Sequence, residues 1–185
     1  MLRGTWICLL LLLSGCAGAF VTREAPGRHD VGSSYSIQAT QAWSRYPGPP
    51  ESRTIDGLAL GSLQTWSNVK DGDVLFPQAQ MKPPPFRADS TPIEVAELVS
   101  ETIEITITGA DVTVKDFKPI AFGAREGFSF ELHYSGDGLP IRGLAAGALH
   151  DGKLDLIIFT APAEYYFDHY APKIERIIAS VETRA

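Results

Sequence analysis

The most reactive side chain of the sequence is the thiol of Cys16, which follows a short apolar segment near the N-terminus. It ends the run Leu13-Ser14-Gly15-Cys16, and Arg3 is the only charged side chain before it. The two residues before the cysteine are small, which suits a peptidase that must grip an extended backbone. The apolar core, 6–13, has eight residues, whereas a helix that crosses the bilayer needs roughly 20. Residues 1–15 are therefore predicted to be a secretion signal and not a membrane-spanning helix.

This stretch resembles the signal of bacterial lipoproteins, in which a basic start and an apolar run lead into a four-residue box ending in cysteine. The resemblance implies that Cys16 receives a thioether-linked diacylglycerol, that cleavage occurs just before it, and that in many bacteria the new amine is acylated, with palmitate as the expected chain. Two or more acyl chains hold a protein stably on a membrane. Because Ala17 and not Asp follows the cysteine, the resemblance points, in a Gram-negative organism, to the outer membrane, facing the periplasm. The alternative is an ordinary signal cleaved near 17–19, with Cys16 incidental.

The composition predicts a single domain whose stability depends on its hydrophobic core. The only other cysteine, Cys8, lies within the signal, so the mature domain forms no disulfide in a compartment that would permit one. Hydrophobic residues make up 44% of the chain, which excludes a disordered composition. The net charge is -6 and Lys and Arg are not clustered, so we expect no nucleic-acid partner.

Catalytic and metal-binding motifs are not evident in the sequence. No two of the four histidines have the spacing of a helical metal site, and we expect surface positions for His29, His133, His150 and His169. The Asp71-Gly72-Asp73 run predicts a turn, because an EF-hand calcium loop spaces its acidic residues over twelve positions. The sequence has no Gly-x-Ser-x-Gly nucleophile elbow. We therefore predict no metal, no cofactor and no enzymatic activity.

The N-terminal half is predicted to be a tether followed by short strands. Residues 16–34 lack an apolar period and are expected to be a lipidated flexible tether, so that the domain spans 35–185. Alternation predicts a strand over Tyr35–Trp43, and a strand pair over 54–57 and 60–69. Proline-rich runs predict loops at 47–50 and at 77–87, the second irregular and exposed.

A helix is predicted to begin after Thr91. Thr91 is a good cap, Pro92 fits the first helical position, and Glu94 completes a capping box. Its end is ambiguous, because 103–107 alternate as in a strand, but we favour a helix that ends at about Ile107.

The C-terminal half is predicted to form an antiparallel meander followed by helices. Strands are expected at 112–118, 128–134, 141–149 and 154–159, with a tight hairpin at Asp151-Gly152. The small residues of 141–149 are expected to pack closely against a helix. Helices are expected from Pro162 and, after an interruption, from Pro172, the second with one apolar stripe. The fold class is therefore α+β, with a central antiparallel sheet flanked by helices.

The C-terminal part resembles the PsbP-like family of α/β/α sandwiches. The resemblance is carried by Gly127–Phe130, Gly152–Leu154, Phe159–Pro162 and Ile177–Ser180, with an earlier match at Thr54–Gly57. It covers most of 35–183 and rests on structural motifs. It implies the sandwich fold and a role in binding or assembly, and it carries no catalytic motif.

An aromatic cluster near the C-terminus is the best candidate for a binding surface. Helical geometry places Tyr166 with Tyr170 and directs Tyr165 elsewhere. These rings are either core residues or, with Trp66, a patch for a partner, since tyrosine is favoured in interfaces. The sequence thus favours a non-catalytic envelope lipoprotein, anchored through Cys16, that binds or helps assemble another envelope component. We expect that component to be a protein, of unknown identity. The alternatives are an envelope hydrolase with an unrecognised site and a small-ligand carrier.

Overall fold

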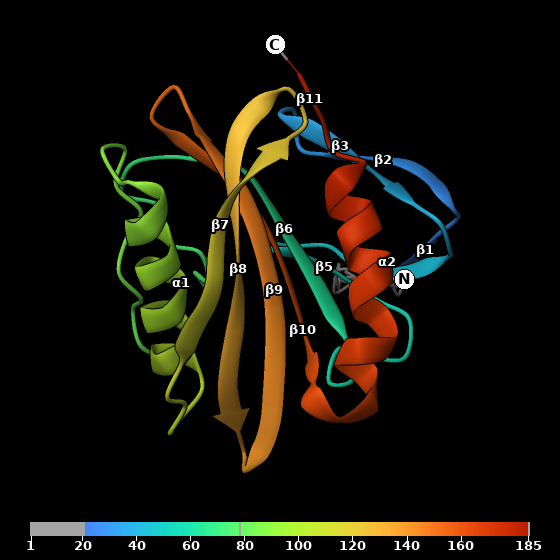
Figure 1. The fold of residues 1–185 in the computed structure, drawn as a ribbon, viewed down its shortest axis with the longest axis vertical. Helices are drawn as coiled ribbons and strands as arrows, with labels where there is room; N and C mark the ends of the chain where they lie inside the picture. The colour runs from blue at the N-terminus through green and yellow to red at the C-terminus, as the bar shows by residue number, and fades with distance from the viewer. Residues whose placement is uncertain (1–20, 78, 185) are drawn as a thin grey trace, which may run out of the picture.

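The computed structural model describes residues 21–77 and 79–184, and they form the predicted α+β sandwich. An eight-stranded antiparallel sheet lies in the middle. Helix α1 (Pro92–Thr106) covers one face, and α2 (Asp168–Ala179) with a three-stranded sheet covers the other (Figure 1). None of the helices within these residues is long and apolar enough to span a membrane.

Within the described residues, β1 and β7 are the two edge strands of the large sheet. Sequential hairpins give one half of the sheet, and β6 pairs with β10 to join it to the other half. The order is β1 (Thr22–Glu24), β4 (Trp43–Tyr46), β5 (Glu51–Thr54), β6 (Ser62–Val69), β10 (Lys153–Pro162), β9 (Leu139–His150), β8 (Arg125–Gly136) and β7 (Thr113–Phe122). The small sheet is ordered β11 (Glu182–Thr183), β3 (Tyr35–Ala39) and β2 (Gly27–Val31).

The prediction of a flexible tether is wrong for residues 22–31, which form β1 and β2. β1 pairs with β4 at the edge of the large sheet, and β2 pairs with β3. These strands lack an apolar period because long-range pairing, rather than local pattern, stabilises them. The domain therefore begins at or before Thr22 and not at Tyr35. The predictions for 1–20, including the box Leu13-Ser14-Gly15 and Cys16, lie outside the described residues.

The single strand predicted over Tyr35–Trp43 is instead two strands in different sheets. β3 ends at Ala39 in the small sheet, and β4 begins at Trp43 in the large one. The strand predicted at 54–57 lies earlier, as β5, whereas β6 confirms the prediction for 60–69. The loop at 77–87 is irregular as predicted, but it is not exposed throughout, because Phe86 is fully buried in the core beneath α1.

α1 confirms the sequence prediction at both ends. The Thr91 side chain accepts a hydrogen bond from the Glu94 backbone, and the Glu94 carboxylate accepts one from the Thr91 backbone. The helix continues to Thr106 with Ile107 as its C-cap, which excludes the strand alternative for 103–107. Its buried side packs in the same core as the phenylalanines of β8.

The meander is present as predicted. The small residues of β9, however, do not pack against a helix as expected. Gly143, Ala145 and Gly147 of β9 lie opposite the large residues of β8, and Gly147 pairs with Phe128. A Cβ atom at Gly147 would lie 3.2 Å from the Phe128 ring. The small residues thus make room for side chains of the neighbouring strand, and α1 lies over those side chains instead of against β9.

The C-terminal helices differ from the prediction around the aromatic cluster. Residues 163–167 form one irregular turn, η1, in which Tyr165 has φ 65° and ψ −58°. Pro172 does not begin a helix but lies inside α2. Pro172 is the fifth residue of α2, so its missing N–H removes one intrahelical hydrogen bond, the one to the Asp168 carbonyl. The predicted apolar stripe of α2 is confirmed, since Ile174, Ile177 and Ile178 are buried.

Candidate functional site

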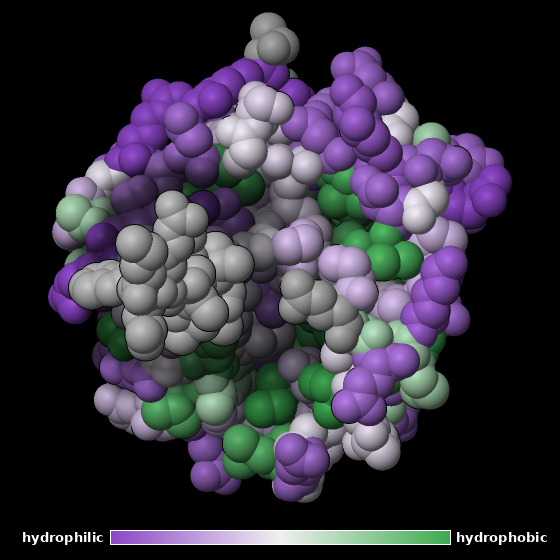
Figure 2. Space-filling model, turned by 180° about the vertical axis from the view of Figure 1, so that it is seen from behind, coloured by the Kyte–Doolittle hydropathy of each residue, from purple (hydrophilic) through white to green (hydrophobic). Residues whose placement is uncertain are grey.

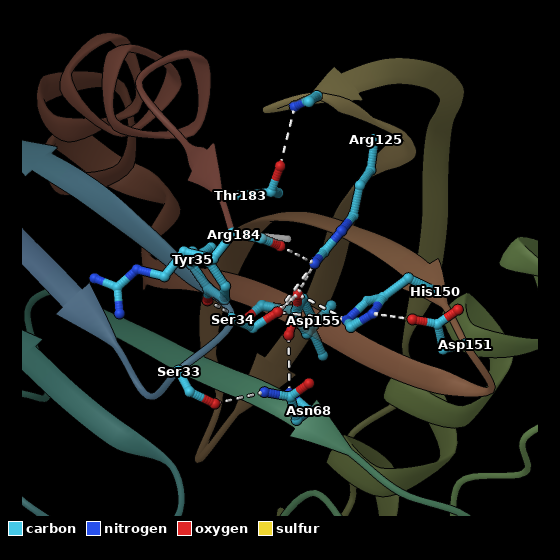
Figure 3. A network of polar contacts seen from close by, with 12 residues as sticks. Ser33, Ser34, Tyr35, Asn68, Arg125, His150, Asp151, Asp155, Thr183 and Arg184 are labelled. Carbon is cyan, nitrogen blue, oxygen red and sulfur yellow. Dashed lines mark hydrogen bonds and ion pairs between the residues drawn. The ribbon is translucent and has the colours of Figure 1, made fainter.

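The first group of functional side chains surrounds Asp155, which is 0% exposed on the inner side of β10 (Figure 3). Its Oδ2 accepts a hydrogen bond from Ser34 Oγ and pairs with Arg125 Nη1 at 2.5 Å. His150 Nε2 lies 3.0 Å from the same oxygen. The other carboxylate oxygen, Asp155 Oδ1, accepts a hydrogen bond from the backbone N–H of Asn68 at 2.8 Å. We call these five residues the Asp155 cluster.

Five separate segments of the chain supply this cluster. Ser34 comes from the turn between β2 and β3, and Arg125 begins β8. His150 ends β9 beside the tight hairpin, and Asn68 lies in β6. Arg125 also donates to the carbonyl of Arg184, just after β11, at 2.9 Å. The cluster therefore joins the large sheet to the small one.

The cluster contains Ser, His and Asp but not the geometry of a catalytic triad. In a triad the histidine contacts the serine through one ring nitrogen and the carboxylate through the other. Here Ser34 Oγ, at 3.4 Å, and Asp155 Oδ2 both lie nearest Nε2 of His150. Ser34 is only 4% exposed and donates to the carboxylate. Three donors, from Ser34, Asn68 and Arg125, satisfy the buried carboxylate, and His150 lies beside it, which is a structural role.

The remaining histidines do not converge. His29 bonds the Ala25 carbonyl at 2.8 Å, His133 lies 3.1 Å from Glu131, and His169 stacks on Tyr165. The described part of the chain holds no group of three His, Cys, Asp or Glu side chains arranged for a metal ion. The expected surface placement is wrong for two histidines, since only 17% of the His29 side chain and 13% of the His150 side chain are exposed. The one sequence signal for the position of His150 was Asp155, a lone acid in a mostly apolar strand.

A second polar network joins side chains of β1, β5 and β6, on the β1 side of the large sheet. Arg53, 1% exposed, donates to Glu24 at 2.8 Å, Glu51 at 3.0 Å and Thr65 at 3.1 Å. Arg45 also bonds Glu51 at 3.2 Å. Burial alone would raise the pKa of Glu51, but hydrogen bonds from Arg45 and the charge of Arg53 outweigh it and lower that pKa.

A groove of about 560 Å³ lies beside both networks, on the side of the molecule that carries β5 and the 72–77 loop. Figure 2 shows the side of the molecule that faces away from the viewer in Figure 1, with hydrophilic residues along its upper rim and hydrophobic residues gathered lower down. Glu51, Thr65 and Asn68 line the groove together with Val31 and several prolines. Ser67 also lines it and, with Lys70, has the Ser-x-x-Lys spacing of penicillin-binding enzymes. These two residues lie at the end of a strand and not at the start of a helix, where that motif acts.

The predicted partner patch of Tyr165, Tyr166 and Trp66 is wrong for Trp66. That side chain is 6% exposed, and its Nε1 donates to the Leu75 carbonyl at 2.8 Å. Trp66 packs in the core beneath α1, whereas Tyr166 packs against the core on the other face of the sheet. The local sequence does not distinguish a buried tryptophan on a strand from an exposed one.

Tyr165 and Tyr166, the other two residues of the predicted patch, lie together in η1, just before α2. Tyr165 is 70% exposed, meets Tyr166 edge-on at 5.2 Å between ring centroids, and stacks on His169 at 5.5 Å. We call these three rings the aromatic surface. Tyr170, by contrast, is buried, and its hydroxyl donates to Asp56. Burial and that hydrogen bond raise the pKa of Tyr170 well above its ordinary value.

Comparison with known proteins identifies the fold. No family model matches the chain, and no curated protein matches it by sequence. The solution structure of cyanobacterial PsbP (CyanoP) from Synechocystis sp. PCC 6803 matches 95% of this chain and 99% of its own at 15% identity, with a TM-score of 0.56. LpqN of Mycobacterium tuberculosis, involved in cell envelope biogenesis, matches 92% of this chain and 88% of its own at 10% identity and a TM-score of 0.40. The chain therefore has the PsbP-like α/β/α fold that the sequence predicts.

Proposed function

We propose that the protein is a lipid-anchored, non-catalytic component of a bacterial envelope that binds, or helps to assemble, another envelope protein. The anchor is the acylated Cys16, and Ala17 after it favours the outer membrane, facing the periplasm. The observation that carries the binding role is the aromatic surface, with Tyr165 70% exposed on a strained turn.

The turn holds Tyr165 outward at an energetic cost. Its φ of 65° and ψ of −58° lie outside the regions that L residues favour, which costs of order 1–3 kcal/mol. Phe167, the last residue of the turn, is buried, and the Arg142 guanidinium lies 4.1 Å from the centroid of its ring. These contacts fix the turn, so Tyr165 is presented in one position. Tyrosine supplies a large contact area at a small entropic cost, which is why it is favoured where proteins meet.

The non-catalytic role is supported by the Asp155 cluster. It is the place where Ser, His and Asp come together in the described chain, and its carboxylate is already occupied by its neighbours. The groove of about 560 Å³ does not have Asp155 or His150 in its lining.

The anchor is tested by mass spectrometry of the protein purified from cell membranes. The expected N-terminal peptide begins at Cys16 and carries the mass of a diacylglyceryl group, with or without an added acyl chain. Cys16→Ala is expected to leave the protein unprocessed or detached, and Cys8→Ala serves as the matched control. An unmodified Cys16 thiol, or a different first residue, would contradict the anchor.

The binding role is tested by placing a photo-crosslinking amino acid at Tyr165 of the lipidated protein in cells. Phe117, another exposed aromatic residue at 39%, lies on the edge strand β7 and is the matched control position. We expect one reproducible protein adduct from position 165 and none of the same mass from position 117. Identical adducts from both positions, or none from either, would contradict a specific partner surface.

The groove favours a small-ligand carrier as the second candidate, because its volume lies within the range of ligand sites, roughly 300–1,000 Å³. Native mass spectrometry of the protein extracted from membranes tests this alternative. A bound small molecule that is lost in Ser67→Trp, and retained in an exposed control such as Lys118→Trp, would favour the carrier.

A further inference from the structure

The distance between the proposed anchor and the folded domain is short. Thr22 begins β1 and follows Cys16 by six residues. Because an extended chain spans at most about 3.6 Å per residue, their Cα atoms lie no more than about 22 Å apart in any conformation. If Cys16 carries lipid, β1 therefore stays close to the headgroups.

Charge is distributed unevenly between the N-terminal strands and the rest of the domain. Residues 21–54 contain four arginines and three acids, a net charge of +1, whereas 55–185 contain 11 basic and 19 acidic residues, a net charge of −8. α1 alone carries four glutamates and no basic residue. The region nearest the anchor is thus the part of an acidic protein that an anionic membrane repels least.

Arg23 is the side chain best placed to meet that surface. It lies exposed on β1, the outermost strand of the large sheet, and forms no ion pair among the described residues. Its neighbour Glu24 is already paired with Arg53 at 2.8 Å. A guanidinium group binds phosphate oxygens through two parallel hydrogen bonds, which suits a lipid headgroup.

We infer that the β1 edge docks on the bilayer that holds Cys16, with Arg23 bound to a phosphate headgroup. This inference rests on the proposed lipid anchor. The opposite edge, β7, is seven strand spacings away, or roughly 34 Å at about 4.8 Å per spacing. β7 therefore projects away from the membrane.

The test uses the full lipidated protein in vesicles of phosphatidylglycerol and phosphatidylethanolamine with a quencher on a fraction of the headgroups. The mature sequence has no cysteine besides Cys16, so Thr22→Cys and Lys118→Cys each accept one fluorophore, on β1 and β7. Flotation of the vesicles measures attachment separately. We expect strong quenching at position 22 and little at position 118.

A second pair of variants separates docking by Arg23 from the reach of the tether. Twelve Gly and Ser residues are inserted after Ala19 of Thr22→Cys, with and without Arg23→Ala. We expect Arg23→Ala to lower the docked population about fivefold in low salt and to have little effect where salt screens the charges. Arg23→Lys should restore most of the quenching.

Three results would overturn the inference. Attached protein that is quenched equally at positions 22 and 118, or docking unchanged by Arg23→Ala in the long-tether variant, would contradict it while leaving the anchor intact. Failure of the wild-type protein to float with the vesicles would contradict the anchor and the docking together.

Discussion

The Asp155 cluster and the aromatic surface contain residue types that do chemistry or bind partners, but they are constructed in opposite ways. The cluster buries its polar groups and satisfies each with another, so it joins two sheets. The aromatic surface leaves Tyr165 exposed on a strained turn whose neighbours are firmly packed. In this domain the convergent polar side chains hold two sheets together, whereas the exposed, strained Tyr165 is the feature on which the proposed binding role rests.

The largest effect is expected from breaking the cluster. Asp155→Ala leaves Arg125 without its buried partner, and loss of one member of a buried pair costs about 3–5 kcal/mol. Urea unfolding measures the free energy, and Asp155→Asn keeps the variant series measurable if the alanine variant does not fold. Asp168→Ala, which removes an exposed pair with Arg142, is the control and should cost about 0–1 kcal/mol. Equal losses in both variants would contradict the structural role.

A smaller effect of opposite sign is expected at the aromatic surface. Tyr165→Gly relieves the strain of a positive φ, so the free energy of unfolding should rise by about 1 kcal/mol after the entropic cost of glycine. The same variant should lose partner binding. A variant that is less stable and still binds would place Tyr165 with the structural residues.

The Arg53 network should contribute to the free energy of unfolding in a pH-dependent way. The pKa of Glu51 is lowered from 4.5 in the folded protein, so its stabilising contribution is present above pH 4.5 and is lost as the pH falls through the lowered value. Stability measured from pH 6 to pH 3 should therefore decline less steeply in Glu51→Gln than in the wild type. Parallel curves would show that Glu51 does not couple to folding.

Much of the fold was predictable where the determinants are local. The capping box at Thr91, the Asp151-Gly152 hairpin and the stripe of α2 each depend on residues within a few positions of one another. β1 and β2 were not predicted because they are formed by pairing with β4 and β3.

The candidate site was less predictable for the same reason. The five segments that meet at Asp155 share no local pattern, and only the acid within the apolar β10 signalled a buried polar group. Helical geometry correctly separated the exposed Tyr165 from the buried Tyr170. It was wrong to separate Tyr165 from Tyr166, because the two rings meet edge-on in η1, which is not a regular helix. Trp66 was misplaced because strand alternation alone does not show which faces are covered.

The most direct test of the central claim compares two single substitutions in the lipidated protein, with the photo-crosslinker placed at the exposed Glu164. Tyr165→Ala should reduce the yield of the partner adduct at least about tenfold, as expected for the loss of an interface anchor residue. Phe117→Ala, on β7, should leave the yield unchanged. An adduct that persists in Tyr165→Ala, or that disappears equally in both variants, would contradict the assignment of binding to the aromatic surface.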